Sequence, residues 1–165
     1  MLVAVISDIH DNLVNLEKCL DWCREKRVAK LILCGDTTNI KTIDYLAANF
    51  PGEIFIIRGN IELYEETELN NFKNINYLGE IGFIELDNLL VAACHEPEKI
   101  KKIKELAVKT PNFIFYGHTH KPWIEKNEGS VIANPGNLAN IFHAPTFALL
   151  DTATRKLELK ILADL

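Results

Sequence analysis

The sequence predicts an α/β fold in which two β-sheets pack face to face and helices cover their outer sides. Short apolar runs alternate with amphipathic segments over residues 1–58, a pattern typical of parallel strands joined by crossover helices. After about residue 74 the pattern changes to short strand-like runs separated by turns, with one helix among them. The chain has 165 residues, which suits a single domain spanning 1–165 with a well-buried core.

The first half of the chain contains three apolar runs that suit strands buried on both faces, because they are rich in valine and isoleucine. These runs lie at 2–7, 30–34 and 53–58. Helices are predicted between them, at 12–26 and 40–50. In the first helix Leu13, Leu16 and Leu20 recur on one stripe. Asn12 precedes that stripe at a position where its side chain can cap the helix.

The second half contains shorter strand-like runs. They lie at 75–79, 82–86, 89–94, 113–117, 123–126, 130–133, 146–151 and 156–162. The Asp-Asn pair at 87–88 predicts a hairpin turn between two of them. One helix is predicted at 97–109, with Ile100, Ile103, Leu106 and Ala107 facing inward. Its lysines predict a solvated face, or alternatively a surface that steers an anionic substrate.

Composition excludes several classes of protein. The formal net charge is −5 and no dense cluster of lysine and arginine occurs, so nucleic acid is not the expected partner. The N-terminus lacks the basic start of a signal peptide. An uncharged stretch at 129–150 is long enough to cross a membrane, but its asparagines, prolines and glycines exclude a spanning helix. It predicts a polar loop followed by a strand, and no membrane partner is expected.

The cysteines predict core positions in a reducing, cytoplasmic environment. The chain has four of them and no CxxC spacing. Cys19 and Cys23 stand four residues apart on the first predicted helix, so a shared metal is an alternative for that pair. Packing as small apolar side chains is the favoured interpretation.

Six of the predicted strands end in a glycine or in a short polar side chain with ligand chemistry. The polar residues at these ends are Asp8, His10, Asp36, Asn60, His95, His118, His120 and Asn134. In α/β sheets functional groups gather at the carboxyl ends of the strands, so these side chains are predicted to converge on one crevice. Four of the five histidines of the chain belong to this set, which isolated structural histidines would not explain.

The convergent side chains predict a metal centre. Imidazoles, carboxylates and one amide oxygen without a thiolate favour Mn, Fe, Co, Ni or Zn over a structural zinc site. Four histidines, two aspartates and one asparagine make seven candidate ligands, more than one catalytic ion needs, so two ions are predicted. Two divalent ions and two aspartates leave a net charge of about +2, or about +1 with a hydroxide. That charge suits a phosphate anion, although a dinuclear peptidase is an alternative.

The motifs Asp-x-His, Gly-Asp, Gly-Asn, His and Gly-His-x-His, in this order, resemble the calcineurin-like metallophosphoesterases. Arg-Gly-Asn with Glu62 nearby is most similar to the compact YfcE-type prokaryotic phosphodiesterases, and the resemblance covers residues 1–151. It implies a four-layer αββα sandwich of two mixed sheets. It also implies hydrolysis by direct attack of a metal-bridging hydroxide. Two divalent ions are implied; manganese is favoured, and Ni, Co, Fe, Zn or Mg are alternatives.

The resemblance also implies which residues bind each ion. The first ion would be bound by Asp8, His10, Asp36 and His120. The second would be bound by Asp36, Asn60, His95 and His118, so that Asp36 bridges the two. Asp36, Asn60, His118 and Glu62 are the candidate catalytic residues. The candidate substrate-binding residues, each with a purely structural alternative, are Asn12, Arg58, Asn134 and Gly136.

Three positions depart from the family pattern. Ile61 replaces a histidine that protonates the leaving group in many relatives, so esters with easily departing leaving groups should react fastest. Glu62 replaces an aspartate of the compact subgroup, and a solvated glutamate at a helix start is its alternative. Glu96-Pro97 follows His95 where the family favours glycine, which alters the predicted entrance to the site.

These observations predict a phosphodiesterase or phosphatase with an open site that accepts small phosphate esters. A homo-oligomer is expected only by analogy with related compact enzymes. The rival interpretation is a protein-interaction scaffold, because the retromer subunit Vps29 resembles this fold and acts without catalysis. A large exposed apolar patch away from the metals would favour that rival. A nuclease is disfavoured, since the chain lacks a basic surface and the Gly-Asn-His motif.

Overall fold

Two β-sheets lie face to face in the computed structural model, which describes residues 1–165. The six-stranded sheet has the order β11-β10-β1-β2-β3-β4. Its strands are β1 (Leu2–Ile6), β2 (Lys30–Leu33), β3 (Glu53–Ile56), β4 (Ile75–Tyr77), β10 (Thr146–Asp151) and β11 (Lys156–Ile161). The five-stranded sheet has the order β5-β6-β7-β9-β8. Its strands are β5 (Ile81–Leu86), β6 (Leu89–Cys94), β7 (Phe113–Phe115), β8 (Trp123–Asn127) and β9 (Ser130–Asn134).

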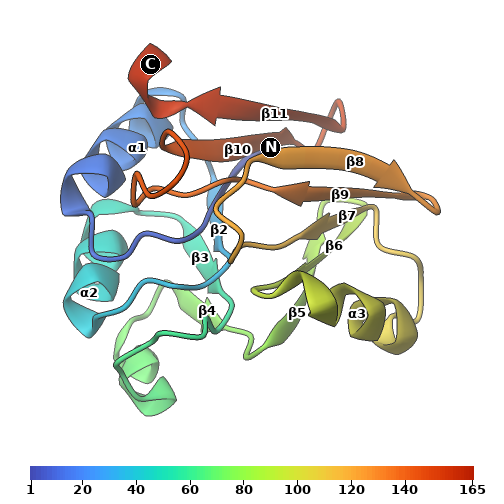
Figure 1. Cartoon of the computed structure of the whole chain (residues 1–165), viewed down its shortest axis with the longest axis horizontal. Coiled ribbons are helices and arrows are strands. Elements are labelled where there is room, and N and C mark those ends of the chain that lie inside the picture. The colour runs from blue at the N-terminus through green and yellow to red at the C-terminus, as the bar shows by residue number, and fades with distance from the viewer.

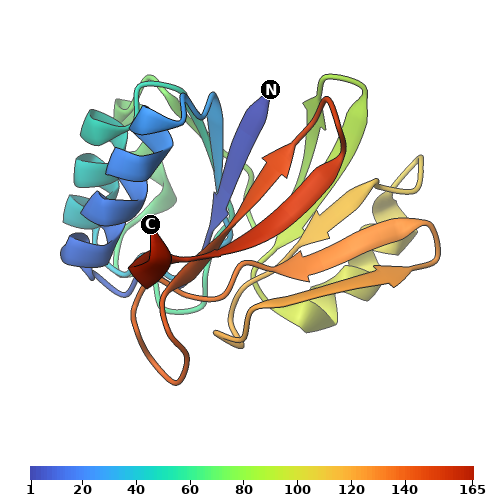
Figure 2. The same cartoon turned by 90° about the horizontal axis from the view of Figure 1, so that it is seen from above.

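Helices form the two outer layers, as Figures 1 and 2 show. The six-stranded sheet is covered by α1 (Leu13–Glu25) and α2 (Ile40–Asn49). On the far side of the other sheet lies α3 (Ile100–Leu106). Short 3₁₀ turns lie at Glu66–Asn71, Pro97–Lys99 and Leu162–Asp164. The predicted αββα sandwich of two mixed sheets is therefore confirmed.

Three layers of apolar side chains hold these four layers of structure together. One lies between α1, α2 and the six-stranded sheet, where Leu16 and Phe147 are fully buried. The second fills the space between the sheets and includes Val5 from one sheet and Phe115 from the other. The third, smaller layer places Ile103 of α3 against the five-stranded sheet. Burying side chains of this size is worth about 1.5–3 kcal/mol each, so the sheet interface fixes how the two halves face each other.

The parallel strands of both sheets determine where the loops gather. β1, β2 and β3 run in the same direction, and so do β6, β7 and β9. Short apolar strands buried on both faces favour this parallel arrangement. The carboxyl ends of each set therefore lie at one edge of its sheet, and the two edges adjoin. In Figure 2 the loop between β9 and β10 also emerges at this side of the molecule.

Two apolar side chains and one helix differ from the prediction. The helix predicted at 97–109 is regular only at Ile100–Leu106, because it starts as a 3₁₀ turn at Pro97 and ends at Leu106. So short a helix buries only Ile103 fully, and the Leu106 side chain, predicted to face inward, is 55% exposed. Leu13, in the first turn of α1, is exposed as well.

The cysteines and the hairpin turn follow the prediction. All four cysteines are unpaired and buried. Burial raises the pKa of the Cys34 thiol, and it raises that of Cys94 to about 12, which fits their role as apolar core residues. β5 and β6 pair as an antiparallel hairpin with Leu86 opposite Leu89, and Asp87 at its tip has a φ of 52°. None of the helices has the length and hydropathy needed to traverse a membrane.

Candidate metal centre

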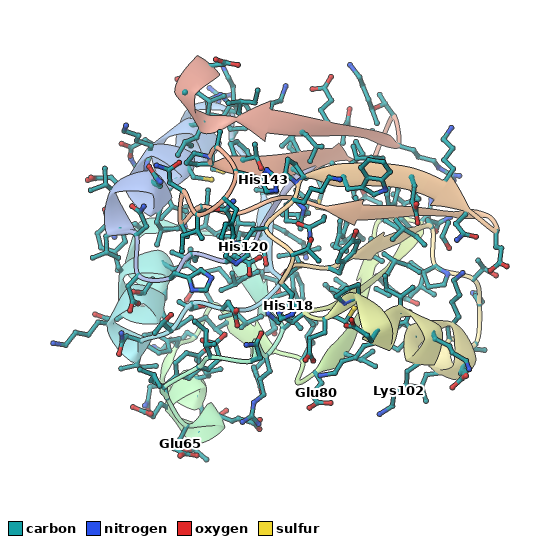
Figure 3. All side chains as sticks on the ribbon, viewed as in Figure 1. Glu65, Glu80, Lys102, His118, His120 and His143 are labelled. Atoms are coloured by element: carbon teal, nitrogen blue, oxygen red, sulfur yellow. The ribbon has the colours of Figure 1, made fainter.

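Seven of the predicted ligands come together at the adjoining edges of the two sheets. Asp8 and His10 follow β1, Asp36 follows β2 and Asn60 follows β3, all from the six-stranded sheet. The five-stranded sheet contributes the other three ligands, His95 after β6 and both His118 and His120 after β7. Figure 3 shows His118 and His120 near the middle of the face turned to the viewer. Both sheets therefore contribute to one site.

The backbone at these ligands has an uncommon conformation. Five of them have φ angles in the left-handed region, which are 52° at Asp8, 46° at His10, 57° at Asp36, 64° at His118 and 59° at His120. Such angles are uncommon outside glycine and cost free energy unless the surroundings fix them. Here the backbone N–H of His118 donates to both Asp8 carboxylate oxygens at 3.2 and 3.1 Å. Strain of this kind gathers at functional sites.

The first cluster consists of Asp8, His10 and His120. The Nε2 atom of His120 lies 3.3 Å from Asp8 Oδ1 and 3.1 Å from His10 Nε2. His10 Nε2 is 3.9 Å from the same Asp8 oxygen. Asp8 is fully buried, whereas His10 is partly open to solvent. Two imidazole nitrogens and a carboxylate thus point at a common position.

The second cluster consists of Asp36, His95 and His118, with Asn60 among them. His95 Nε2 lies 3.2 Å from Asp36 Oδ2 and 2.8 Å from Asn60 Oδ1. His118 Nδ1 is 2.9 Å from the same Asn60 oxygen. His95 is buried and its Nδ1 lies 2.7 Å from the Cys34 carbonyl, which fixes the ring orientation. His118, in contrast, is exposed.

Asp36 connects the two clusters. Its Oδ1 accepts hydrogen bonds from the backbone N–H groups of Asn60 at 2.8 Å and Ile61 at 3.2 Å. Its Oδ2 is 3.2 Å from His95 Nε2 in one cluster and 4.0 Å from His10 Nε2 in the other. One oxygen therefore organises the loop after β3, and the other faces both groups of imidazoles.

The charges of these groups reinforce one another. Burial favours the neutral form of Asp36, but the hydrogen bond and charge of His95 outweigh it, so the pKa of this carboxyl is lowered. Burial likewise opposes protonation of His95, and Asp36 outweighs it, so that the pKa of His95 is raised. The pKa of His120 is raised chiefly by its hydrogen bond to Asp8. Buried carboxylates beside imidazole nitrogens favour a positive charge between them, as a metal site requires.

The donor sets fit divalent cations. Within each cluster the ligand atoms of the histidines and aspartates lie within 4.8 Å of one another. Ligands about 2.1 Å from one ion stand ~3.0–3.4 Å apart, close to the shorter contacts observed. The buried Nδ1 of His120 has no hydrogen-bond partner, which fits a ring positioned through its Nε2. Each cluster can therefore hold a divalent ion.

Two glycines at this edge allow the loops to approach closely. A Cβ atom on Gly59 would lie 2.2 Å from the Asp36 backbone nitrogen, and one on Gly117 would lie 2.0 Å from Ser7 Oγ.

Asp11 is a functional-site residue that the sequence did not single out. Its carboxylate accepts hydrogen bonds from Asn39 and from Thr42 Oγ1 at 2.6 Å, and so joins the loop after β1 to α2. Its place directly after Asp-x-His was the only signal.

The candidate substrate-binding residues have partners inside the chain. Asn12 caps α1, accepting from Asn15 N at 3.1 Å, and donates to the Ala139 carbonyl at 3.2 Å. Arg58 pairs with Glu66 at 2.8 Å. Buried Asn134 donates to the Gly117 carbonyl at 2.7 Å, and its Oδ1 accepts from Gly136 N at 2.8 Å. Their structural alternatives are thus observed, and a contact with substrate stays a prediction.

Glu62 lies beside the second cluster and binds backbone groups. Its Oε2 accepts from Thr38 N at 2.9 Å, and its Oε1 accepts from Thr37 N at 3.3 Å and Gly59 N at 3.2 Å. No helix begins at this residue, so the interpretation as a solvated glutamate at a helix start is wrong. Glu62 ties the loop after β2 to the loop after β3.

Replacing Glu62 by glutamine should lower the free energy of unfolding by about 1–3 kcal/mol, because the new NH₂ group cannot accept the bonds that one oxygen now accepts. Chemical denaturation measures this. Glu98→Gln is the matched control, since Glu98 is exposed, and it should change stability by less than about 0.5 kcal/mol. Equal stabilities for the two variants would contradict the backbone role of Glu62.

Asn137, a second residue that the sequence reasoning missed, is fully buried beneath the site. Its side chain donates to the carbonyls of His120 at 3.2 Å and His143 at 3.3 Å.

A polar cleft of about 360 Å³ borders Asn60, and Arg58, Glu96 and Lys99 line it. The Lys99 ammonium lies 2.7 Å from a Glu96 carboxylate oxygen, so its positive charge is neutralised within the cleft.

Comparisons with known proteins agree with this geometry. Residues 1–155 match the model of the calcineurin-like phosphoesterase superfamily domain. The chain is 28% identical over 163 residues to phosphodiesterase MJ0936 of Methanocaldococcus jannaschii, which covers 94% of this chain and 96% of that protein.

Two solved structures share the fold. One, described as a novel archaeal phosphodiesterase, has a TM-score of 0.86 and 23% identity, covering 98% of this chain and 99% of that one. Vps29 of Chaetomium thermophilum has a TM-score of 0.73 and 16% identity, covering 98% and 95%. At these identities the two structures show a common architecture, with the first superposing more closely.

Proposed function

Because the chain belongs to the calcineurin-like phosphoesterase superfamily, we propose that it is a phosphodiesterase or phosphatase that uses two divalent metal ions to hydrolyse small phosphate esters. One observation carries this proposal. Two groups of ligands, each drawn from both sheets, lie on either side of Asp36, whose Oδ2 lies 3.2 Å from His95 Nε2 and 4.0 Å from His10 Nε2. A carboxylate so placed suits a bridge between two ions.

The proposed ligands follow from the two clusters. The first ion is assigned to Asp8, His10, Asp36 and His120, and the second to Asp36, Asn60, His95 and His118. When bound, the ions would supply Lewis-acid charge and an activated water as the nucleophile. Manganese is the favoured metal, with Ni, Co, Fe, Zn and Mg as alternatives, since the donors are imidazole and oxygen.

The residues of the chain have separate tasks in this scheme. Asp36 Oδ1 accepts a hydrogen bond from the backbone N–H of Asn60. The carboxylate that is proposed to bind both ions therefore also positions Asn60, a proposed ligand of the second ion. His95 is buried and its ring is fixed by the Cys34 carbonyl, whereas His118 is exposed at the mouth of the site. An incoming ester therefore meets His118 and Asn60, the two exposed ligands.

Small esters suit the open form of the site. His118 and Asn60 are exposed at the edge of the sandwich, where an ester can reach them from solvent. The adjoining cleft of about 360 Å³ has no hydrophobic lining, and its two cations pair with carboxylates, Arg58 with Glu66 and Lys99 with Glu96. A net charge of −5 disfavours nucleic acid as the substrate. Four unpaired cysteines favour a cytoplasmic location.

Hydrolysis of bis(p-nitrophenyl) phosphate by metal-stripped protein tests the proposal, with one metal restored at a time. Turnover should appear only with metal and should be lost in His118→Ala. His143→Ala is the matched control, because His143 belongs to neither cluster, and it should retain metal binding. If the protein bound two ions per chain and hydrolysed neither monoesters nor diesters, the proposed enzymatic function would be refuted.

The scaffold on the same fold is the second candidate, favoured by one observation. A groove of about 790 Å³ lies by the tip of the β5–β6 hairpin, at the opposite edge of the sheet from the histidines. Phe83, Leu106 and Val108 line it and expose apolar surface. All seven ligand positions are nevertheless filled by ligand-type residues, which a scaffold would not require. Metal binding without turnover on any ester would shift the balance to this role.

A further inference from the structure

The loop between β9 and β10 carries an exposed aromatic side chain beside the metal centre. Phe142 is 89% exposed. Its ring centroid is 5.9 Å from that of His120, with an angle of 50° between the two rings. Figure 2 shows this loop projecting beyond the sheets, and Figure 3 places His143, the next residue, near His120. One side of the Phe142 ring thus faces a proposed ligand, and the rest faces solvent.

Phe142 adopts a conformation that a bulky side chain rarely takes. Its φ is 63°, and the backbone N–H of His143 donates to the Ile141 carbonyl at 2.8 Å, which makes a γ-turn with a positive φ at its centre. That turn is rare and strained, and a positive φ at a bulky residue is an outlier. Because the ring is exposed, apolar burial contributes little free energy to offset this strain. Folding alone gives no reason for phenylalanine here.

The γ-turn is anchored to the metal centre by Asn137. The Oδ1 of this buried amide accepts from Ile141 N at 3.1 Å, and its Nδ2 donates to the His143 carbonyl at 3.3 Å. The same Nδ2 donates to the carbonyl of His120 at 3.2 Å. One side chain therefore holds both ends of the turn and the backbone of a proposed ligand. The backbone of the turn that carries the ring is therefore held beside the site.

We propose that Phe142 is a substrate-contacting residue that stacks against a planar aromatic ring of the phosphate ester. This inference rests on the proposed function, because the ester must be seated at the metal centre for its ring to reach Phe142. An exposed aromatic face attracts another planar ring by offset stacking, whether a simple aryl group or a nucleobase. Ile141, which is also exposed, widens the apolar platform. The preferred substrates are therefore aryl or nucleoside phosphate esters over aliphatic ones.

Binding of two phosphonates that cannot be hydrolysed tests the contact without relying on turnover. The dissociation constants of phenylphosphonate and methylphosphonate are measured by calorimetry with manganese-loaded protein. The dissociation constant of the wild type should be about tenfold lower for the phenyl compound, the preference expected when two aromatic rings stack. Phe142→Ala should reduce the preference to about twofold or less, and Phe142→Trp should preserve it. A second pair, the phosphonate analogues of AMP and of ribose 5-phosphate, shows whether a nucleobase is accepted as well as an aryl ring.

Phe83→Ala is the matched control for these measurements. It also removes a partly exposed aromatic ring, 38% exposed, but from the groove at the opposite edge of the sheet. It should leave the preference for phenylphosphonate unchanged. If Phe142→Ala kept the wild-type preference, or if hydrolytically active wild type bound both phosphonates equally, the stacking proposal would be refuted and the proposed function would stand. Wild type that hydrolyses no ester and binds neither phosphonate would refute both.

Phe142→Asn separates a substrate role from a structural one. Asparagine tolerates the left-handed region, so this variant should raise the melting temperature by about 2–4 °C while losing the phenyl preference. A lower melting temperature together with an intact preference would identify Phe142 as a structural residue. Sedimentation of the wild type and Phe142→Ala examines the remaining occupant, a second copy of the chain. A dimer that dissociates in the variant while the phenyl preference persists would overturn the proposal.

Discussion

Replacement of Asp36 by asparagine should reduce metal-dependent hydrolysis of a phosphodiester by about a thousandfold or more, since several kcal/mol of charge stabilisation are lost. The substitution preserves shape. An asparagine oxygen can still accept the hydrogen bonds of Asn60 N and Ile61 N that Asp36 Oδ1 accepts now. Its NH₂ group would then face the histidines of both clusters, where it cannot bind a metal and carries no negative charge. Both proposed ions lose a ligand while the loop stays in place.

The Asp36→Asn variant is measured by turnover and by calorimetric titration of metal into stripped protein. The number of ions bound per chain should fall, and the melting temperature of the metal-free protein should change little. Asp11→Asn is a matched control, because Asp11 also follows a strand, has a φ of 58° and has a carboxylate that bonds only to Asn39 and Thr42. It should keep turnover within about tenfold of the wild type. Full activity in Asp36→Asn would contradict the bridging assignment.

Gly59→Ala should damage both stability and activity. The added Cβ would lie 2.2 Å from the backbone nitrogen of Asp36 and 2.2 Å from its Oδ1, and 2.7 Å from Glu62 Oε1. A backbone atom cannot rotate out of the way, so the loops after β2 and β3 must separate. Overpacking of this kind costs about 1–3 kcal/mol. A shift of about 1 Å in the ligands reduces turnover by roughly a hundredfold.

Gly79→Ala distinguishes this crowding from the general cost of losing a glycine. A Cβ at Gly79 would meet no atom within 4 Å, but its φ of 73° is unfavourable for alanine. The variant should therefore lose about 1–2 kcal/mol of stability and keep its activity. Thermal melts and turnover on the same preparations give both quantities. Equal activity in the two variants would mean that the loops after β2 and β3 tolerate separation.

The position of the candidate metal centre could be predicted from the sequence because of the parallel strands. Once 2–7, 30–34 and 53–58 are read as neighbouring strands, Asp8, Asp36 and Asn60 must lie at one edge. The separate pattern of β6, β7 and β9 places the histidines in the same way. These are consequences of strand direction alone, and they require no knowledge of side-chain packing.

Features that depend on contacts between loops could not be predicted. Whether Asn134 and Asn12 face a ligand or their own chain depends on where Gly117 and Ala139 lie, and both come from other elements. The role of Asn137 likewise requires the carbonyls of His120 and His143 to converge on one amide. Leu106 seemed to belong to an apolar stripe, but the helix ends before a neighbour can cover it.

The division of the ligands between two sheets has a consequence for the folding of the molecule. Each cluster joins residues that are far apart in the chain, such as Asp8 with His120 and Asp36 with His95. A cation seated in either cluster would thus act as a reversible cross-link, closing a long loop as a disulfide does in secreted proteins. Each tenfold excess of free metal over its dissociation constant adds about 1.4 kcal/mol to the folded state. The seam between the two halves of the sandwich would then open more readily in a chelator than in a metal buffer, independently of any substrate.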